Sequence, residues 1–243
     1  MNPKILIAGP EDKADYFKPY IEAVRLAGGD PELGLPDPEI AAYPNSLFFF
    51  LNCYGGILLP GGKDIDPKFY GEPRHPTTNP ADPDLDIGQL AVAKMLIEES
   101  IPALAICRGL QVVTVAAGEK LVQDLPSQWE SGIKVDHRVD EPKDRLVHAV
   151  EADPDSRLAE ICGELRFEVN SRHHQAAREG ATAGRIGPFR IVARAPDGVI
   201  EGFELPGHPF FIAIQWHPEN LVETHPPSRN LMGEFINKAN QRE

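Results

Sequence analysis

The sequence has few cysteines, few basic residues and no long apolar run. Its 243 residues include three cysteines, Cys53, Cys107 and Cys162. Their odd number and unpaired spacing argue against a disulfide framework and against a zinc cluster. The longest apolar stretches, residues 46–51 and 210–216, are far shorter than the roughly 20 residues of a membrane span. We therefore expect neither a membrane-spanning nor a disulfide-stapled protein.

Positive charge is scarce as well. The chain has 24 lysine and arginine residues against 37 aspartate and glutamate residues, a formal net charge of -13 at pH 7. Such a balance repels nucleic-acid phosphates and anionic lipid heads, so we expect no nucleic acid and no membrane among the partners. The apolar run before Gly9 is too short for the core of a secretory signal, which predicts a cytoplasmic protein.

What remains is the composition of an ordinary globular protein, with 42% hydrophobic and 25% charged residues. Short runs that are apolar on both faces alternate with segments of helical spacing. The runs are residues 4–9, 55–62 and 101–107, and the helical segments are residues 16–29 and 87–100. This alternation is typical of a parallel sheet covered by helices on both faces, so we predict one α/β domain over residues 1–243.

The second half of the chain is less regular. Polar sequence with proline and glycine between residues 124 and 144 predicts a loop or lid. Residues 190–206 and 208–219 resemble strands, with a hairpin signal at Asp197-Gly198. A helix is expected over residues 221–240.

The most informative segment is LAICRGLQVVTVAAG, residues 104–118, in which an apolar strand meets a helix at Cys107. The unpaired amides and the positive dipole end of a helix N-terminus favour a thiolate there. Gly109 allows the sharp turn that exposes the sulfur, as in a nucleophile elbow. Cys107 is therefore a candidate nucleophile, although a small buried hydrophobic residue is the equally weighted alternative.

A candidate base follows in IQWHPE, where His217 and Glu219 are two residues apart. On an extended backbone they point to the same face, so the carboxylate can orient the imidazole. Without Cys107, this pair would be interpreted as a solvated surface pair. In LLPGGKDIDPKFYGE, Gly61 and Gly62 could direct an amide toward a developing oxyanion, with the amide of Arg108 as a second donor, although most such loops are plain turns.

Together these segments resemble the class I glutamine amidotransferase-like superfamily, and within it the γ-glutamyl-γ-aminobutyrate hydrolase family of γ-glutamyl peptidases. Six motifs in the family's order carry the resemblance over nearly the whole chain: AVRLAGGDP, LLPGGKDIDPKFYGE, AICRGLQ, VNSRHHQA, APDGVIEGFE and IAIQWHPE. The resemblance implies a three-layer, flavodoxin-like fold with a mostly parallel central sheet. It also implies a reaction that needs neither a metal nor an organic cofactor.

The same resemblance assigns the site. Cys107 would be the nucleophile, His217 the general base and then acid, and Glu219 the orienting carboxylate. The amides of Gly62 and Arg108 would form the oxyanion hole. The residues implied in substrate binding are Gly61, Gln111, Asn170, Ser171, Arg172, His173, His174 and Gln175. Three positions depart from the family's pattern, namely Leu85, Gln89 and Leu110.

These inferences predict a hydrolase that cleaves the γ-amide bond of a small γ-glutamyl compound. A glutaminase subunit that passes ammonia to a synthase partner would use the same triad, so this alternative stays open. A third alternative is a binding or regulatory protein that keeps the fold without turnover. The sequence leaves the leaving amine and homo-oligomerisation open.

Overall fold

A large central sheet organises the protein, which the computed structural model describes over residues 2–79 and 82–242. Five adjacent strands are parallel, in the order β2 (Asp30–Gly34), β1 (Lys4–Ala8), β3 (Gly56–Leu59), β4 (Ala103–Ile106) and β12 (Phe211–Ile214). Antiparallel strands extend the sheet beyond β12: β11 (Ile200–Glu204), β10 (Phe189–Arg194), β6 (His148–Ala152) and β7 (Arg166–Val169), with β9 (Arg185–Ile186) beside β10. A two-stranded sheet pairs β5 (Leu121–Val122) with β8 (Ala176–Ala177).

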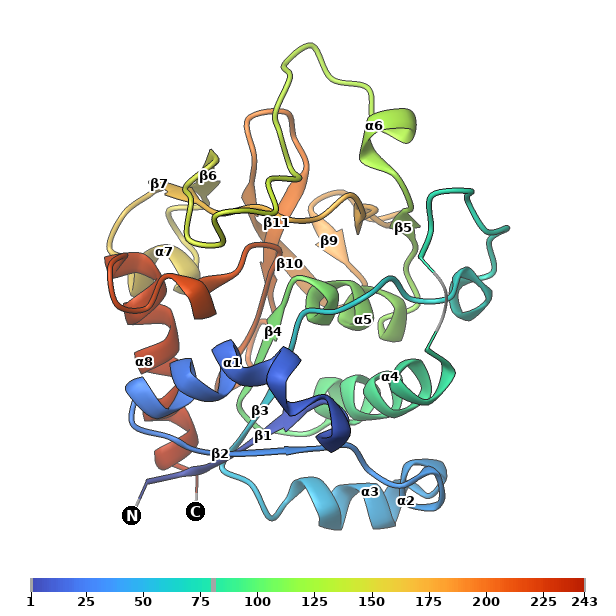
Figure 1. The fold of residues 1–243 in the computed structure, drawn as a ribbon, viewed down its shortest axis with the longest axis vertical. Coiled ribbons are helices and arrows are strands. Elements are labelled where there is room, and N and C mark those ends of the chain that lie inside the picture. Colours follow the sequence, from blue (N-terminus) through green and yellow to red (C-terminus); the bar gives the residue numbers. More distant parts are fainter. Residues whose placement is uncertain (1, 80–81, 243) are drawn as a thin grey trace.

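Helices cover both faces of this sheet (Figure 1). One face packs against α1 (Ala14–Leu26), α7 (Arg157–Cys162) and α8 (Pro226–Asn240), and the other against α3 (Pro44–Leu51), α4 (Pro83–Glu98) and α5 (Arg108–Ala116). Short helices are α2 (Pro38–Ala42), α6 (Leu125–Gln128), and the 3₁₀ turns η1 (Glu11–Lys13), η2 (Pro67–Tyr70) and η3 (Pro218–Asn220). The three layers of the expected α/β fold are confirmed.

The strands build two hydrophobic cores because successive side chains point to opposite faces. In β1, Ile5 and Ile7 join the core under α1 and α8, whereas Leu6 and Ala8 join the core under α4 and α5. All four side chains are fully buried. This explains why the strands contain apolar residues on both faces.

Several element boundaries differ from the sequence prediction for identifiable reasons. Helix α4 begins four residues earlier than expected because Asp82 caps it, accepting from the amide of Leu85 at 3.3 Å, and Pro83 occupies its first turn. Helix α8 begins five residues later because His225 caps it and prolines follow directly. The hairpin predicted at Asp197-Gly198 joins β10 and β11.

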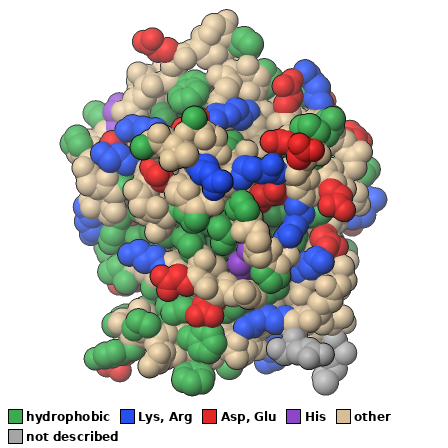
Figure 2. Space-filling view, turned by 180° about the vertical axis from the view of Figure 1, so that it is seen from behind, with side chains coloured by type: hydrophobic (Ala, Val, Ile, Leu, Met, Phe, Trp, Pro, Cys, Tyr) green, Lys and Arg blue, Asp and Glu red, His purple; other side chains and the backbone are tan. Residues whose placement is uncertain are grey.

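The surface view from behind mixes charges of both signs (Figure 2). Hydrophobic side chains gather along its lower edge, in the region of α2 and α3, where Tyr43 and Phe49 are 66% and 69% exposed. Among the described residues, no helix combines the length and apolar character that crossing a membrane requires.

The parallel strands direct their carboxyl ends to a common edge. The loop containing Gly61 and Gly62 follows β3, Cys107 follows β4 and His217 lies three residues after β12. Because β3, β4 and β12 are neighbours in the sheet, these three segments meet at that edge.

Candidate active site

Cys107 occupies a strained turn between β4 and α5. Its φ of 53° and ψ of −104° make it the one non-glycine residue of positive φ in the described part of the chain. Such backbone strain costs of order 1–3 kcal/mol and persists where the surrounding structure imposes it. Gly109 permits the turn, because a Cβ at that position would collide with the carbonyl oxygen of Leu59. The sequence-predicted elbow is therefore present as a backbone geometry.

The imidazole of His217 lies between the carboxylate of Glu219 and the side chain of Cys107. Its Nδ1 lies 2.7 Å from Oε1 of Glu219, so Nδ1 carries the proton that Glu219 accepts. Burial lowers the pKa of His217, but the negative charges of Glu219 and Cys107 outweigh burial and raise this pKa to about 9. The imidazole is therefore charged at neutral pH and faces the cysteine as a potential proton donor.

A cavity of about 350 Å³ brings these groups together. Its lining contains Cys107, His217 and Glu219, together with Gly62 from the predicted oxyanion hole and Arg172 from the predicted substrate segment. The remaining lining residues are Asp15, Tyr16, Pro19, Tyr20, Asp140, Glu141, Lys143 and Asn220. The loop predicted between residues 124 and 144 thus supplies part of the wall.

Tyr20 fixes the glycine loop beside the cysteine, a role that no local sequence pattern indicates. The Gly61 amide donates to the Tyr20 hydroxyl at 3.0 Å. A Cβ on Gly61 would collide with that hydroxyl and lie 3.1 Å from Cε1 of His217. The Gly61 amide is therefore occupied by Tyr20, whereas Gly62 lines the cavity.

The side chain of Arg108 turns away from the cavity. It is 1% exposed and forms an ion pair with Asp86 at 2.5 Å, while its other terminal nitrogen donates to Gln89. Gln89, one of the three departures from the family's pattern, thus holds the arginine that follows Cys107. The other two departures, Leu85 and Leu110, are buried apolar side chains. None of the three lines the cavity.

The predicted substrate residues fall into two groups. Arg172 reaches the cavity, with Nη2 3.4 Å from Oε1 of Glu219. The others have hydrogen-bond partners within the protein. Asn170 bonds the backbone of His217, and Gln111 bonds the side chain of Gln215. The side chains of Ser171, His173 and Gln175 bond the backbone carbonyls of His137, Gln175 and Gln123, respectively. Their contacts with a substrate stay predictions.

His174 lies between two carboxylates and is a structural link in this arrangement. Its Nε2 is 3.1 Å from Asp64 and its Nδ1 is 3.3 Å from Asp124. The hydrogen bond to Asp64 is the main cause that raises the pKa of His174 above its ordinary value. This imidazole therefore connects the segment after β3 to the segment after β5.

A second cluster of titratable groups could hold a metal ion. His137, His148, His173 and Glu201 are all buried, and one ligand atom from each lies within 4.8 Å of the others. From the sequence we expected no metal, because the cysteine spacing argued against a zinc cluster and the family resemblance implied a reaction that needs no metal.

Comparison with known proteins identifies the fold first. Two solved structures match at 18% sequence identity: the glutaminase domain of Trypanosoma brucei CTPS with bound acivicin, with a TM-score of 0.67, and a Thermoplasma acidophilum protein provisionally described as a component of GMP synthase, with a TM-score of 0.63. Each match covers 99% of this chain, and it covers 94% and 96% of the two matched chains, respectively. They share the α/β architecture described above.

Closer relatives are found by sequence. The γ-glutamyl-γ-aminobutyrate hydrolase PuuD of Escherichia coli K12 is 35% identical, over 89% of this chain and 83% of that protein. A Mycobacterium tuberculosis protein provisionally named a glutamine amidotransferase is 37% identical over 86% of this chain, which spans 63% of that relative's length. The model of the peptidase C26 family matches residues 9–219. The chain therefore belongs to the peptidase C26 family, within the class I glutamine amidotransferase-like superfamily, and is a hydrolase.

Proposed function

We propose that this hydrolase cleaves the γ-amide bond of a small γ-glutamyl compound, such as γ-glutamyl-γ-aminobutyrate, through a thioester on Cys107. The observation that carries the proposal is the shared cavity. It places the strained cysteine, the His217–Glu219 pair and the guanidinium of Arg172 around one volume of about 350 Å³. The names of the relatives support the same substrate class.

The first half-reaction uses the charged imidazole. The thiolate of Cys107 attacks the γ-carbonyl carbon, and the carbonyl oxygen becomes an oxyanion. The amides of Gly62 and Arg108 would stabilise this oxyanion, since one lines the cavity and the other begins α5. His217 then gives its proton to the departing amine as the C–N bond breaks, which leaves a thioester and a neutral imidazole.

The second half-reaction returns the enzyme to its starting state. Neutral His217 takes a proton from water, and the resulting hydroxide attacks the thioester carbonyl. The C–S bond breaks, the new carboxylic acid of glutamate gives its proton to solvent as the product leaves, and the thiolate–imidazolium pair is restored. Glu219 stabilises the imidazolium at both stages through the 2.7 Å contact with Nδ1.

The charged lining would select a glutamate that is linked through its side chain. The side chain of Arg172 is 13% exposed, and its Nη1 has no hydrogen-bond partner among the described residues. This nitrogen can donate a hydrogen bond to the α-carboxylate of the substrate, while the carboxylate of Asp140 or Glu141 can accept one from the α-amino group. In an α-linked isomer the α-carboxylate is consumed in the peptide bond. Nη1 of Arg172 would then stay without an acceptor, a loss of about 1–3 kcal/mol.

Purified protein assayed alone against γ-glutamyl amines, their α-glutamyl isomers and free glutamine tests this proposal. We expect glutamate release from the γ-linked compounds and none from the α-linked ones. Equal cleavage of both isomers contradicts γ-glutamyl selection. Activity on glutamine that requires an added synthase supports the glutaminase alternative.

Labelling identifies the nucleophile in the same preparation. Iodoacetamide at pH 7 should modify Cys107 first, and a γ-glutamyl substrate should protect it. Burial raises the pKa of Cys162 to about 12, so this thiol should react slowly, while the exposed Cys53 serves as an ordinary reference. Substrate-protected labelling of Cys53 or Cys162 would contradict the assignment.

A further inference from the structure

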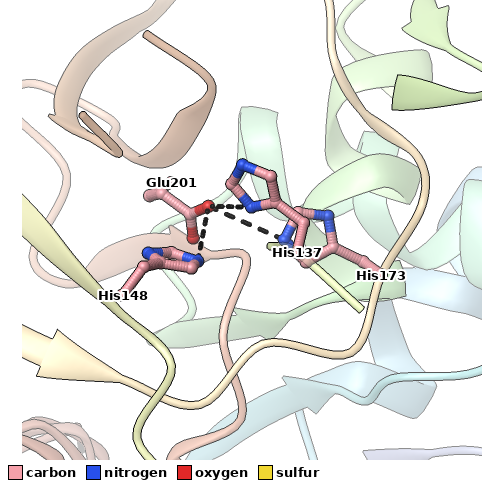
Figure 3. Close-up of side chains that lie close together, drawn as sticks. All are labelled: His137, His148, His173 and Glu201. Carbon is pink, nitrogen blue, oxygen red and sulfur yellow. Dashed lines mark ion pairs between the residues drawn. The ribbon is translucent and has the colours of Figure 1, made fainter. Parts of the chain in front are cut away.

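Four side chains from separate segments point their polar atoms at one small volume (Figure 3). His137 comes from the loop before β6, His148 begins β6, His173 follows β7 and Glu201 lies in β11. Oε1 of Glu201 is 3.4 Å from Nδ1 of His137, 3.7 Å from Nε2 of His148 and 3.6 Å from Nε2 of His173. These four atoms lie within 4.8 Å of one another.

The cluster is buried, and its inward atoms lack partners. The exposed fraction of each residue is 7% or less, and that of Glu201 is 0%. Within residues 2–79 and 82–242, the three inward nitrogens and both oxygens of Glu201 have no hydrogen-bond partner. The distances of 3.4–3.7 Å exceed the ordinary N–H···O range of about 2.7–3.2 Å. Buried polar groups are rarely left in this condition without an unseen partner.

The outward nitrogen of each histidine, by contrast, has a hydrogen-bond acceptor. Nε2 of His137 lies 3.0 Å from a carboxylate oxygen of Asp197, Nδ1 of His173 lies 2.8 Å from the carbonyl of Gln175, and Nδ1 of His148 lies 3.1 Å from the carbonyl of Ala149. Each acceptor can hold a proton on the outward nitrogen, and it directs the inward nitrogen toward the shared volume as a potential ligand. Metal-bound histidines in proteins are oriented in this way, often by a carboxylate.

We propose that His137, His148, His173 and Glu201 form a binding site for one divalent transition-metal ion, with Zn²⁺ as the best match. Three imidazole nitrogens and one carboxylate oxygen are ligands that Zn²⁺ accepts in tetrahedral geometry. With bonds of about 2.0–2.1 Å, neighbouring ligand atoms in a tetrahedral site are about 3.3 Å apart. The three distances to Glu201 are near this value, so modest side-chain rotation would complete the site.

The position of the site indicates a structural role. Four protein ligands in a buried cluster leave no open coordination position for a reacting water. His137 and His173 lie on segments that pair through their backbones, since the amide of His173 donates to the carbonyl of His137 at 2.8 Å. One of these segments continues to Asp140, Glu141 and Lys143, and the other begins next to Arg172, all of which line the catalytic cavity. A bound ion would therefore fix two walls of that cavity.

The test uses full-length protein that has been dialysed against a chelator and then metal-free buffer. One equivalent of Zn²⁺ should raise the midpoint of thermal unfolding by about 4 °C or more, because an ion that binds the folded state stabilises it. Co²⁺ should give the intense visible absorption of tetrahedral coordination, and metal analysis of repurified protein should find about one ion per chain. These readouts do not depend on catalytic activity.

Two variants and a matched control locate the ion. Glu201→Gln and His148→Gln should lose the cobalt spectrum and the zinc-dependent rise in melting temperature. His208→Gln should keep both, because His208 is similarly buried but bonds the carbonyl of Glu99 outside the cluster. Wild-type protein that neither retains metal nor gives the tetrahedral spectrum would overturn the proposal, and so would metal binding that is unchanged in both cluster variants.

Discussion

Asn170 clamps the backbone of His217 with both ends of its side-chain amide. Its Oδ1 accepts from the amide of His217 at 2.9 Å, and its Nδ2 donates to the carbonyl of His217 at 2.9 Å. The same Nδ2 donates to the carbonyl of Lys143 at 2.9 Å. Asn170 thereby connects the imidazole to the loop that closes one side of the cavity, although the resemblance had assigned it to substrate binding.

Replacing this clamp should affect turnover more than binding. In Asn170→Ala the backbone of His217 loses two buried hydrogen bonds, so the imidazole is free to move relative to Cys107. A misplacement near 1 Å reduces rates by about 100-fold, and we expect kcat to fall by about 10–100-fold with little change in KM. Steady-state kinetics measure this split.

Asn220→Ala is the matched control, because Asn220 lines the cavity but its side chain does not hold His217. We expect its kcat to stay within a few-fold of wild type. A variant of Asn170 whose KM rises while kcat is preserved would show that the side chain acts on the substrate instead of on the histidine.

The strain at Cys107 predicts that replacing this residue can stabilise the protein. Cys107→Gly should relieve the unfavourable backbone at φ 53°, whereas Cys107→Ala keeps the strain and loses the thiol. Both variants should be inactive, and we expect the glycine variant to unfold with a free energy about 1 kcal/mol higher than the alanine variant. Denaturant titrations of the two proteins give this difference. Equal stabilities would show that the elbow is not strained in solution.

The sequence predicted the strand–elbow–helix around Cys107 because local signals determine it: an apolar run, a small residue and a helical pattern. It also placed His217 near the end of a strand, but the extended backbone expected through Glu219 was wrong, because β12 ends at Ile214 and Pro218–Asn220 form a 3₁₀ turn. Tyr20, Asp86 and the histidine cluster were missed, because their roles depend on contacts between distant segments that no local pattern encodes. Asp86 shows this clearly, since its partner Arg108 lies 22 residues away and the pair is fully enclosed.

The buried pair of Asp86 and Arg108 predicts a large and specific loss of stability. In Asp86→Asn the guanidinium of Arg108 stays buried without its counter-charge, which costs about 3–5 kcal/mol. Asp84→Asn is the matched control, because Asp84 lies in the same first turn of α4 and is exposed. Its free energy of unfolding should change by less than about 0.5 kcal/mol. Similar losses in the two variants would mean that the charge of the helix turn matters and the ion pair does not.

Glu219 and Cys107 raise the pKa of His217, and this predicts an alkaline limit for the reaction. His217 has a pKa raised to about 9, so its imidazolium is present at neutral pH and is lost as the pH rises through about 9. The stability that this raised pKa contributes is fully present below the ordinary value of 6.5 and disappears as the pH rises from there through about 9. We therefore expect kcat/KM to fall as the pH passes about 9.

Glu219→Gln should move that limit to lower pH. Glutamine can still accept a hydrogen bond from Nδ1, but it lacks the negative charge that raises the pKa of His217. Activity at pH 7 should decrease, by less than in His217→Ala, and the alkaline limb of the kcat/KM profile should shift by about one unit or more. Glu223→Gln removes the same charge from an exposed position nearby in sequence and should leave the limb in place. A limb near pH 9 that persists in Glu219→Gln would mean that Cys107 alone, and not the carboxylate, holds the proton on His217.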